Sequence, residues 1–576
     1  MAKTCRQLHP VKKNKVTAPT VASDMSPLLR TFLYITAAIT GAVILIVEIL
    51  GAKMLSPYLG TSHFVWTAQI AVTLVALSAG YFAGGWLVDR SPKLNRLYYA
   101  ILASAVYLCA TVPMVKPLCL KLMSLPLEWA ALLASAFLFL VPLALLAMTG
   151  PFLVRMLTQS VKTIGTNMGR LTAISTLGSV AGCVLIGFVL IPHLPNSVTM
   201  LITAGVLVAL SGVYLIIWGR TEAGFTVLVV AIVICLSFGY SGLRGQFGKR
   251  MKYDNANWDV LYRENSNYGE LLVIQHRGAY GVRRVYLNDK LTQNTYDPEE
   301  QKSRSLFTGA LRWLAHAYTP KIERVLCIGM GAGIVPMQFA SVGIETDVVE
   351  INGAVVPLAE KYFDFDSSKL TLTIGDGRQF LNQNDDRYDA IILDAFLGDS
   401  SPSHLMTKEA FTEMRRHLTE RGVLVINSFG ESSPDRQFFA ASLDQTLRAA
   451  FGQKGVKVHA SGYGNVFFVA ASAGELTEHN PPIPPDSEAK QRLDDASTDE
   501  ATIAEWRKWH AAAKGQGPFF SEHAQVQSEM GLMWKKQLAF DDPSKGQILR
   551  DDFNPVEFYD SRNREDNRRN LVEYLE

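Results

Sequence analysis

Residues 325–339 read VLCIGMGAGIVPMQF, an apolar run that meets three alternate glycines and then resumes in a helix-like pattern. This order predicts a buried strand, a tight turn and a helix. The glycines are Gly329, Gly331 and Gly333, and their lack of a side chain lets the backbone approach a ligand closely. The pattern alone is weak evidence for a ligand, because strand-to-helix turns in many α/β proteins use glycine.

The segments that follow the glycine turn alternate between strand and helix. Helix-like stretches near Val335, over 355–362, near Phe380 and over 408–418 separate four further apolar strands, TDVVEI, LTLTIGD, YDAIILDAF and GVLVINSF. Such alternation predicts a parallel, doubly wound Rossmann-like sheet, in which ligands bind at the carboxyl ends of the strands.

Two acidic residues stand at the ends of the second and third strands. Glu350 lies about twenty residues beyond the first glycine, where an acidic side chain can accept both hydroxyls of a ribose. Asp376 follows in Gly375-Asp376-Gly377 and can accept from an exocyclic amine such as that of adenine. No Gly-Lys-Ser/Thr follows the glycine turn to hold phosphates. These features favour an adenosine ligand over ATP.

The fourth strand ends in DAFLGDSSPSHLMTKEAF, residues 394–411. Asp394 there can neutralise a cationic amine and, as a general base, accept its proton when the amine attacks carbon. A cap of a helix or turn is the structural alternative for Asp394. Asp399 is equally consistent with a contact to a substrate amine and with ordinary turn chemistry. His404 fits a structural role better than a catalytic one.

The amino-terminal half is strongly apolar, in a chain of 576 residues with 48% hydrophobic residues. The alternative is that these segments are buried helices of a large soluble core, but that would require seven such helices in a row. We therefore expect membrane-spanning helices. The first 27 residues are basic without an apolar core, which predicts a disordered tail and no signal peptide. The apolar segments cover roughly 28–51, 64–88, 97–115, 127–150, 171–192, 198–218 and 223–240.

Composition excludes several classes of function and of structure. A net charge near +2 and the lack of a basic stripe argue against a nucleic-acid partner, and the spacing of the six cysteines suggests neither a metal site nor a disulfide framework. Alternating apolar and polar residues after the last apolar segment predict a small antiparallel sheet. The expected domains are a tail (1–27), a membrane domain (28–240), a small sheet (253–297), a Rossmann-like domain (298–475), and a Pro-rich linker with a charged helical tail (476–576).

The chain resembles the membrane-fused relatives of the spermidine synthases, the aminopropyltransferases that use decarboxylated S-adenosylmethionine. Phrases that carry the resemblance in the membrane half are EILGAKMLSPYLGTSHFVWT, LSAGYFAGGWLVDR and MGRLTAISTLGSVAGCVLIGFVLIP. In the other half they are LNDKLTQ, IGMGAG, VVEIN, IGDGR, DAFLGDSSPSHLMTKEAF and RDDFNPVE. The resemblance implies that Glu350 holds ribose, Asp376 holds adenine and Asp394 accepts the proton.

Departures from the spermidine synthase pattern keep other functions open. Ala332 stands where those enzymes carry an aspartate in the glycine loop, and Tyr268-Gly269 stands where they carry Tyr-Gln. Their Tyr or His with Glu after the small sheet has no clean counterpart around 302–307. A methyltransferase that uses intact S-adenosylmethionine is therefore one alternative. A nucleoside- or polyamine-sensing transporter is another, because Glu48 lies deep in the first apolar segment, where a charge is costly.

The expected partners are a small polyamine and the lipid bilayer, with a homo-oligomer left open. The sidedness of the catalytic domain rests on conflicting signals. The basic tail and the basic residues around 90–96 and 155–170 would lie on one side of the membrane, and the positive-inside rule makes that side cytoplasmic. Seven crossings would then put the catalytic domain on the opposite side, outside the cell. The donor is made in the cytosol, and a basic run follows the last segment. We therefore expect a multi-pass protein of the cell membrane with a cytoplasmic catalytic domain, and with one segment re-entrant or miscounted.

Overall fold

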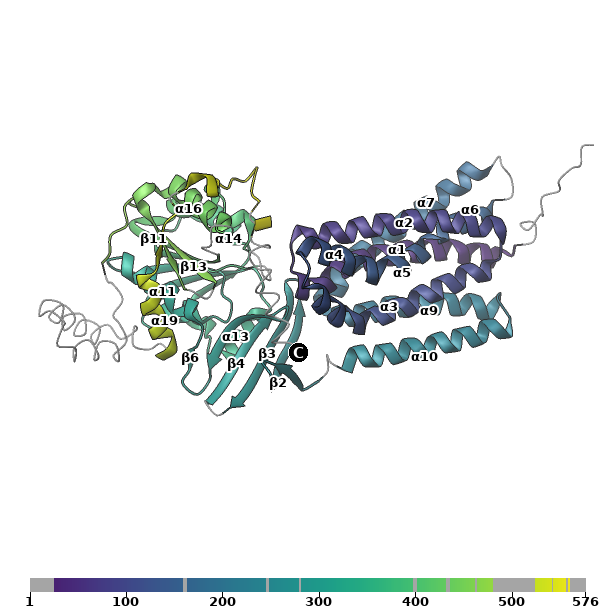
Figure 1. The fold of residues 1–576 in the computed structure, drawn as a ribbon, viewed down its shortest axis with the longest axis horizontal. Helices are drawn as coiled ribbons and strands as arrows, with labels where there is room; N and C mark the ends of the chain where they lie inside the picture. The colour runs from purple at the N-terminus through teal and green to yellow at the C-terminus, as the bar shows by residue number, and fades with distance from the viewer. Residues whose placement is uncertain are drawn as a thin grey trace, which may run out of the picture.

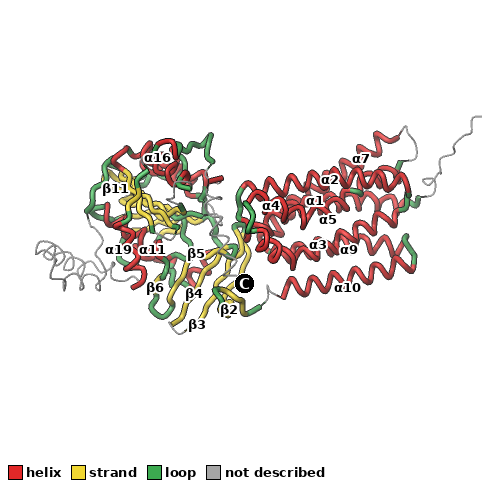
Figure 2. Tube along the Cα trace, viewed as in Figure 1, coloured by secondary structure: helices red, strands yellow, loops and turns green. Residues whose placement is uncertain are grey.

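The computed structural model describes residues 25–158, 163–244, 248–278, 281–396, 401–430, 436–461, 464–479, 524–540, 542–555 and 558–559. A bundle of long helices forms one end of the molecule, and two β-sheets with their covering helices form the other (Figures 1 and 2). The small antiparallel sheet lies nearest the bundle. This arrangement confirms the predicted fold class of a helical domain followed by an antiparallel sheet and a Rossmann-like domain.

Among the described residues, seven helical spans of the bundle are long and apolar enough to cross a membrane. The shortest has 22 residues, which at about 1.5 Å per residue exceeds the roughly 30 Å hydrocarbon core of a bilayer. Two spans contain a π-helical turn, η1 (Ala136–Leu140) and η3 (Ile186–Leu190). The helices are α1 (Pro27–Leu59), α2 (His63–Arg90), α3 (Leu94–Leu122), α4 (Leu127–Ser135), α5 (Val141–Ala147), α6 (Thr149–Leu157), α7 (Ile164–Leu185), α8 (Ile191–His193), α9 (Asn196–Ile217) and α10 (Glu222–Arg244).

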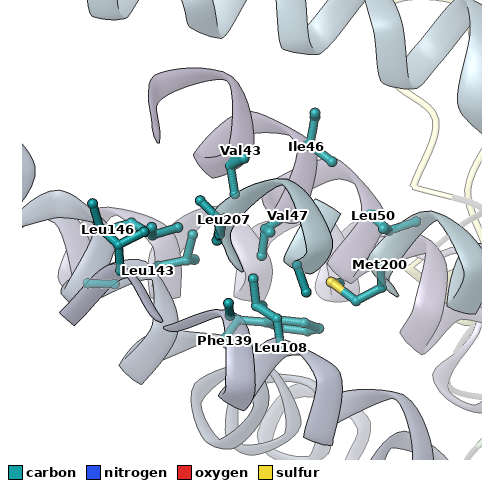
Figure 3. Packing of buried hydrophobic residues seen from close by; sticks show 14 of the residues in the cluster. Val43, Ile46, Val47, Leu50, Leu108, Phe139, Leu143, Leu146, Met200 and Leu207 are labelled. Carbon is teal, nitrogen blue, oxygen red and sulfur yellow. The ribbon is translucent and has the colours of Figure 1, made fainter. Parts of the chain in front are cut away.

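The interior of the bundle is packed, and its outer surface is apolar. Figure 3 shows side chains of α1, such as Val47 and Leu50, meeting Leu108 of α3 and Met200 of α9. Small residues bring α1 and α7 together, because a Cβ added at Gly178 would lie 2.1 Å from the carbonyl oxygen of Ala38. Outward-facing side chains include Phe82, Leu177, Phe188, Phe225 and Leu236. A surface this apolar is typical of contact with lipid, so the bundle indicates membrane insertion.

The helices α1, α2, α3 and α10 lie side by side along the bundle (Figure 1). Tyr214 and the carbonyl of Gly219 meet Asn95 at the end of the bundle away from the sheets. At the other end, Lys53 donates to the carbonyl of Asn267 in the small sheet over 3.3 Å. With seven spans, the start of α1 and the sheets therefore lie at opposite ends.

The small sheet is a six-stranded antiparallel meander in sequence order. Trp258, Leu272 and Leu287 are buried in one cluster, against which Met251 and Tyr253 pack. The other face, including Leu271 and Tyr286, packs against the Rossmann-like domain. Its strands are β1 (Arg250–Tyr253), β2 (Ala256–Ser266), β3 (Gly269–Gly278), β4 (Gly281–Asn288), β5 (Leu291–Asp297) and β6 (Lys302–Ser303).

The second sheet has eight strands in the order β14-β12-β13-β11-β10-β7-β8-β9. The strand order reverses between β7 and β10, which is where open α/β sheets bind ligands. Five strands are parallel: β7 (Arg324–Ile328), β8 (Glu345–Glu350), β9 (Thr371–Ile374), β10 (Tyr388–Leu393) and β11 (Leu418–Phe429). Three further strands pair antiparallel with their neighbours: β12 (Val456–Ala460), β13 (Asn465–Ala471) and β14 (Gln537–Leu538).

Helices cover both faces of this sheet. The face toward α11 and α12 holds the core around Leu314 and Phe339, and the face toward α15 and α16 holds the core around Phe411 and Leu443. The helices are α11 (Leu306–Tyr318), α12 (Ile334–Ala340), α13 (Val355–Tyr362), α14 (Gly377–Asn382), α15 (Lys408–Arg416), α16 (Phe438–Phe451) and α19 (Ala524–Lys535), with short 3-10 turns η4 (Ser367–Lys369), η5 (Ser403–Leu405), η6 (Gln453–Gly455) and η8 (Pro543–Lys545).

Candidate active site

A cavity of about 280 Å³ opens at the carboxyl ends of β7, β8, β9 and β10. The hairpins of the small sheet close its opposite side through Tyr268, Asn288, Thr292 and Gln293. The structure brings together seven of the eight residues that the sequence singled out. Six of them line this cavity: Gly329, Gly331, Glu350, Asp376, Gly377 and Asp394. Gly333 takes part through the loop it ends, since its neighbours Ala332 and Ile334 are the lining residues. Asp399 lies outside the described residues.

The three glycines of the loop have different surroundings. Each has a positive φ, which L side chains adopt only with strain. A Cβ at Gly329 would lie 2.3 Å from the carbonyl oxygen of Asp394, and one at Gly333 would lie 2.4 Å from the ring of Phe365. A Cβ at Gly331 would meet nothing within 4 Å. Thus packing within the protein requires Gly329 and Gly333, whereas Gly331 leaves space on the cavity side.

Glu350 ends β8 and is 8% exposed. Its Oε2 accepts the N–H of Met330 in the glycine loop, and its Oε1 accepts the N–H of Asn352, each over 2.8 Å. Burial raises the pKa of this carboxyl, and the backbone N–H groups oppose that rise. The side chain of Asn352 donates to Ser266 of the small sheet over 3.0 Å. Glu350 therefore fixes the loop, and its side chain lines the cavity where a hydroxyl group of a ligand can approach it.

Asp376 begins α14, and both of its carboxylate oxygens have partners. Oδ1 accepts the N–H of Gln379 over 2.9 Å, and Oδ2 lies 2.7 Å from Nε2 of His404. Partial burial acts to raise the pKa of Asp376, but these two partners hold the pKa below its ordinary value. His404, which the sequence favours as structural, is thus placed in the cavity wall. The neighbouring Gly377 packs against Ile328, where a Cβ would lie 2.4 Å from Cγ2.

Asp394 follows β10, where its N–H donates to the carbonyl of Ile328 over 2.9 Å. Its carboxylate is partly open to the cavity and otherwise enclosed by protein. Burial raises the pKa of Asp394 to about 6, the nearby charge of Glu350 adds to the rise, and Asn427 opposes it. A carboxyl that titrates near neutral pH can both hold a cation and accept a proton.

Two asparagines orient Asp394, and the sequence did not single them out. Nδ2 of Asn427 donates to Oδ1 of Asp394 over 2.9 Å, and Nδ2 of Asn465 donates to Oδ1 of Asn427 over 3.0 Å. Asn427 is 3% exposed at the end of the apolar strand GVLVINSF. A polar residue that ends a buried parallel strand at the ligand-binding edge is the signal that could have identified it.

A segment near the carboxyl terminus supports the wall around Asp376. Nη1 of Arg378 lies 2.8 Å from Oδ1 of Asp551, and the hydroxyl of Thr407 donates to the same oxygen over 2.7 Å. Asn554 donates to the carbonyl of Ser403, which precedes His404. The phrase RDDFNPVE therefore includes residues that hold α14 and η5 in place.

The charges around the cavity have one sign. Its described lining includes three carboxylates, those of Glu350, Asp376 and Asp394, and no Lys or Arg. Asn, Gln, Thr, Ser and Tyr side chains supply the other polar groups. Such a lining favours a ligand that carries positive charge and has few anionic groups.

Fold and site together define a Rossmann-like α/β domain with a small-molecule cavity at its topological switch point. Residues 309–457 match the family model for the spermine/spermidine synthase domain. The carboxyl-terminal half is therefore similar to that family over these residues, which confirms the predicted resemblance for this part of the chain.

Three relatives illustrate the match. A polyamine aminopropyltransferase of Vibrio vulnificus is 34% identical over 180 residues, 30% of this chain and 60% of that protein. A probable polyamine aminopropyl transferase of Bifidobacterium longum is 29% identical over 198 residues, 33% of this chain and 40% of that protein. An N-terminal histidine N-methyltransferase of Emericella nidulans is 35% identical over 116 residues, 19% of this chain and 21% of that protein. The chain thus spans less than two thirds of the length of these relatives.

Proposed function

We propose that the carboxyl-terminal domain transfers an aminopropyl group from decarboxylated S-adenosylmethionine to an amine such as putrescine. The observation that carries this proposal is the cavity lining of three carboxylates without Lys or Arg among the described residues. The decarboxylated donor carries a sulfonium and an ammonium and no carboxylate. Such a dication and a polyamine acceptor both complement this lining, and the match to the spermine/spermidine synthase family supports the same reaction.

The glycine loop and two acidic residues would hold the adenosine end of the donor. Gly331 leaves room beside the loop for the donor, while Gly329 and Gly333 shape it. Glu350 would accept the two ribose hydroxyls, in addition to the backbone N–H groups it already holds. Asp376 and Gly377 lie at the next strand end, where Asp376 would accept from the adenine amine.

Asp394 would act as the proton acceptor. The lone pair of the acceptor nitrogen forms a bond to the methylene carbon beside the sulfonium, the carbon–sulfur bond breaks, and its electron pair neutralises the sulfur. Methylthioadenosine leaves, and the proton released from the new secondary ammonium passes to Asp394. Asn427 would keep Oδ1 of Asp394 oriented during this transfer. Asp399 is proposed as a second contact for the acceptor amine, on sequence grounds alone.

Methyl transfer from intact S-adenosylmethionine is the second candidate. The 35% identity to a histidine N-methyltransferase favours it, as does Ala332 in place of the aspartate of spermidine synthases. Intact S-adenosylmethionine carries a carboxylate, however, and the described lining offers no Lys or Arg to pair with it. A polyamine- or nucleoside-sensing transporter is the third candidate, resting on Glu48 of α1.

One experiment separates these functions. Purified protein is incubated with either decarboxylated or intact S-adenosylmethionine and a panel of amines, and the products are followed by mass spectrometry. We expect methylthioadenosine that depends on both the decarboxylated donor and an amine. S-adenosylhomocysteine from the intact donor would instead establish methyl transfer, and binding of either donor without any product would favour the sensor.

We further propose that the protein resides in the cell membrane with its catalytic domain in the cytoplasm, where the donor is made. Seven spans then place the start of α1 outside the cell. This orientation goes against the positive-inside rule, because Arg90, Lys93 and Arg96 lie at the same end of the bundle. An impermeant thiol reagent applied to intact cells tests this. Ala473→Cys should stay unlabelled and Lys93→Cys should react, and the reverse pattern would put the catalytic domain outside.

A further inference from the structure

A second cavity, of about 570 Å³, lies where the helical bundle meets the small sheet. We call it the junction cavity. On the bundle side, its walls are the ends of α1, α3 and α10 and the start of α9, with Tyr58, Lys116, Asn196 and Gly242 among them. On the other side lie β1, β2, β3 and the turn between β4 and β5. None of these residues lines the candidate active site.

The junction cavity carries an excess of positive charge. Five basic and two acidic side chains line it, which leaves a surplus of three. Two of the basic groups have carboxylate partners: Nε of Arg250 lies 3.0 Å from Asp259, which is outside the cavity lining, and Nε of Arg263 lies 3.7 Å from Glu270. Asp289 accepts the N–H of Glu270 over 2.9 Å. The basic residues are Lys116, Arg250, Lys252, Arg263 and Lys290.

The charge balance rises further when Asp289 is protonated. Asp289 is 7% exposed, and burial raises the pKa of its carboxyl to about 6, while Lys53 and Lys290 oppose the rise. Lys290 donates to the hydroxyl of Tyr58 and stacks on its ring, with Nζ 4.1 Å from the centroid. A phenol does not neutralise an ammonium, so this positive charge remains available to an anion.

Aromatic side chains place the junction cavity at the depth of lipid headgroups. Trp66 lies near the start of α2, Trp129 near the start of α4 and Tyr240 near the end of α10, and all three are exposed on the bundle surface. These three helix ends face the sheets. Exposed Trp and Tyr at the ends of membrane helices mark the boundary between hydrocarbon and water. Ser241 and Gly242, next to Tyr240, line the cavity.

We propose that the junction cavity binds a phosphate group, presented by the headgroup of an anionic phospholipid. Apolar residues beside the basic ones, such as Met54, Val112 and Val115, suit the start of an acyl chain. A free phosphorylated metabolite offers the same phosphate chemistry, and the experiment distinguishes the two sources. This proposal does not depend on the reaction of the catalytic domain.

A ligand in the junction cavity would affect the active site through the hairpin formed by β4 and β5. Asp289 and Lys290 form the turn between β4 and β5, and both have positive φ. Asn288, Thr292 and Gln293 of the same hairpin line the candidate active site. A ligand that orders the turn would therefore order one wall of the other cavity.

The full-length protein is delipidated in detergent and titrated with phosphatidylglycerol or with phosphatidylcholine of the same chains, and bound lipid is counted by native mass spectrometry. The wild type should bind phosphatidylglycerol at least about tenfold more tightly, since each basic residue at a membrane surface favours anionic lipid. The double variant Lys116→Glu/Lys252→Glu should lose this preference. Both side chains are exposed, so the fold should tolerate the change.

Lys121→Glu/Lys249→Glu is the matched control, because both lysines lie at the same end of the bundle, are exposed and do not line the junction cavity. It should keep the preference. The proposal is overturned if both double variants lose the preference for phosphatidylglycerol equally. It is also overturned if the wild type shows no such preference and binds no phosphate. Displacement of the lipid by millimolar glycerol phosphate or inorganic phosphate, dependent on Lys116 and Lys252, would assign the site to a free phosphorylated compound.

Discussion

Asp394→Asn should make the protein more stable and nearly inactive at the same time. The substitution keeps the shape of the side chain and an oxygen that can accept from Asn427. It removes the charge that burial makes unfavourable. Since the pKa of Asp394 rises from 3.8 to about 6 on folding, the ionised carboxylate costs the folded state about 3 kcal/mol near pH 7.5.

The sign of the pH dependence follows from proton uptake. Between pH 3.8 and about 6 the folded state binds more protons at Asp394 than the unfolded state does, so stability falls as the pH rises. The stability advantage of Asp394→Asn should therefore be largest above pH 6 and fall to about half near pH 5. Amine-dependent turnover should drop by about 10²- to 10⁴-fold, because general-base assistance is lost.

The change in stability is measured by thermal unfolding of the intact protein in detergent at pH 7.5 and pH 5. The change in turnover is measured by methylthioadenosine formation at saturating amine. Asp389→Asn is the control, because it removes the same charge at the opposite end of the same strand, where Asp389 accepts the N–H groups of Glu323 and Arg324. The reasoning is refuted if Asp394→Asn gains no stability at pH 7.5, if the gain is the same at both pH values, or if turnover stays near normal.

Three further predictions concern the cavity wall. Glu350→Gln should weaken methylthioadenosine binding by about 1–3 kcal/mol in calorimetry, because its amide cannot accept both backbone N–H groups and the ribose hydroxyls; unchanged affinity would remove Glu350 from the ligand site. Gly329→Ala should lower the melting temperature more than Gly331→Ala, because both positions have a positive φ but only the Cβ at 329 meets the Asp394 carbonyl. Gly331→Ala should still fold and bind methylthioadenosine poorly. Asp551→Ala should speed hydrogen exchange in α14 and lower stability by about 1 kcal/mol, and protection equal to wild type would show that Arg378 does not need this partner.

Local patterns in the sequence were sufficient for the fold class. The alternation of apolar strands and helices predicts a parallel sheet, and the carboxyl ends of parallel strands must share one edge. Glu350, Asp376 and Asp394 each end a strand, so their convergence in one cavity follows from topology alone. The seven apolar segments likewise predict the seven spans, because length and composition decide which helices can cross a bilayer.

Contacts between distant parts of the chain could not be predicted from local sequence patterns. The pairing of Asn465 with Asn427, and of Asp551 with Arg378, depends on how strands and loops far apart in sequence meet in space. The sequence suggested a surface tail after residue 475, yet Gln537–Leu538 add a strand to the sheet. His404 shows a related limit, because a lone histidine in a loop carries no periodic signal for the carboxylate it will meet.

The support that the segment around Asp551 gives to the active site has a consequence for the order of folding during synthesis. Strands β7 to β11 and the loops that hold Glu350 and Asp394 leave the ribosome more than a hundred residues before β14 and Asp551. Until then, Arg378 lacks its carboxylate partner and the edge of β12 is unpaired. A nascent chain halted after β13 would already contain every proposed ligand residue, but its binding wall would still be incomplete. Maturation of the site is therefore among the last steps of folding, after the bundle has had time to insert.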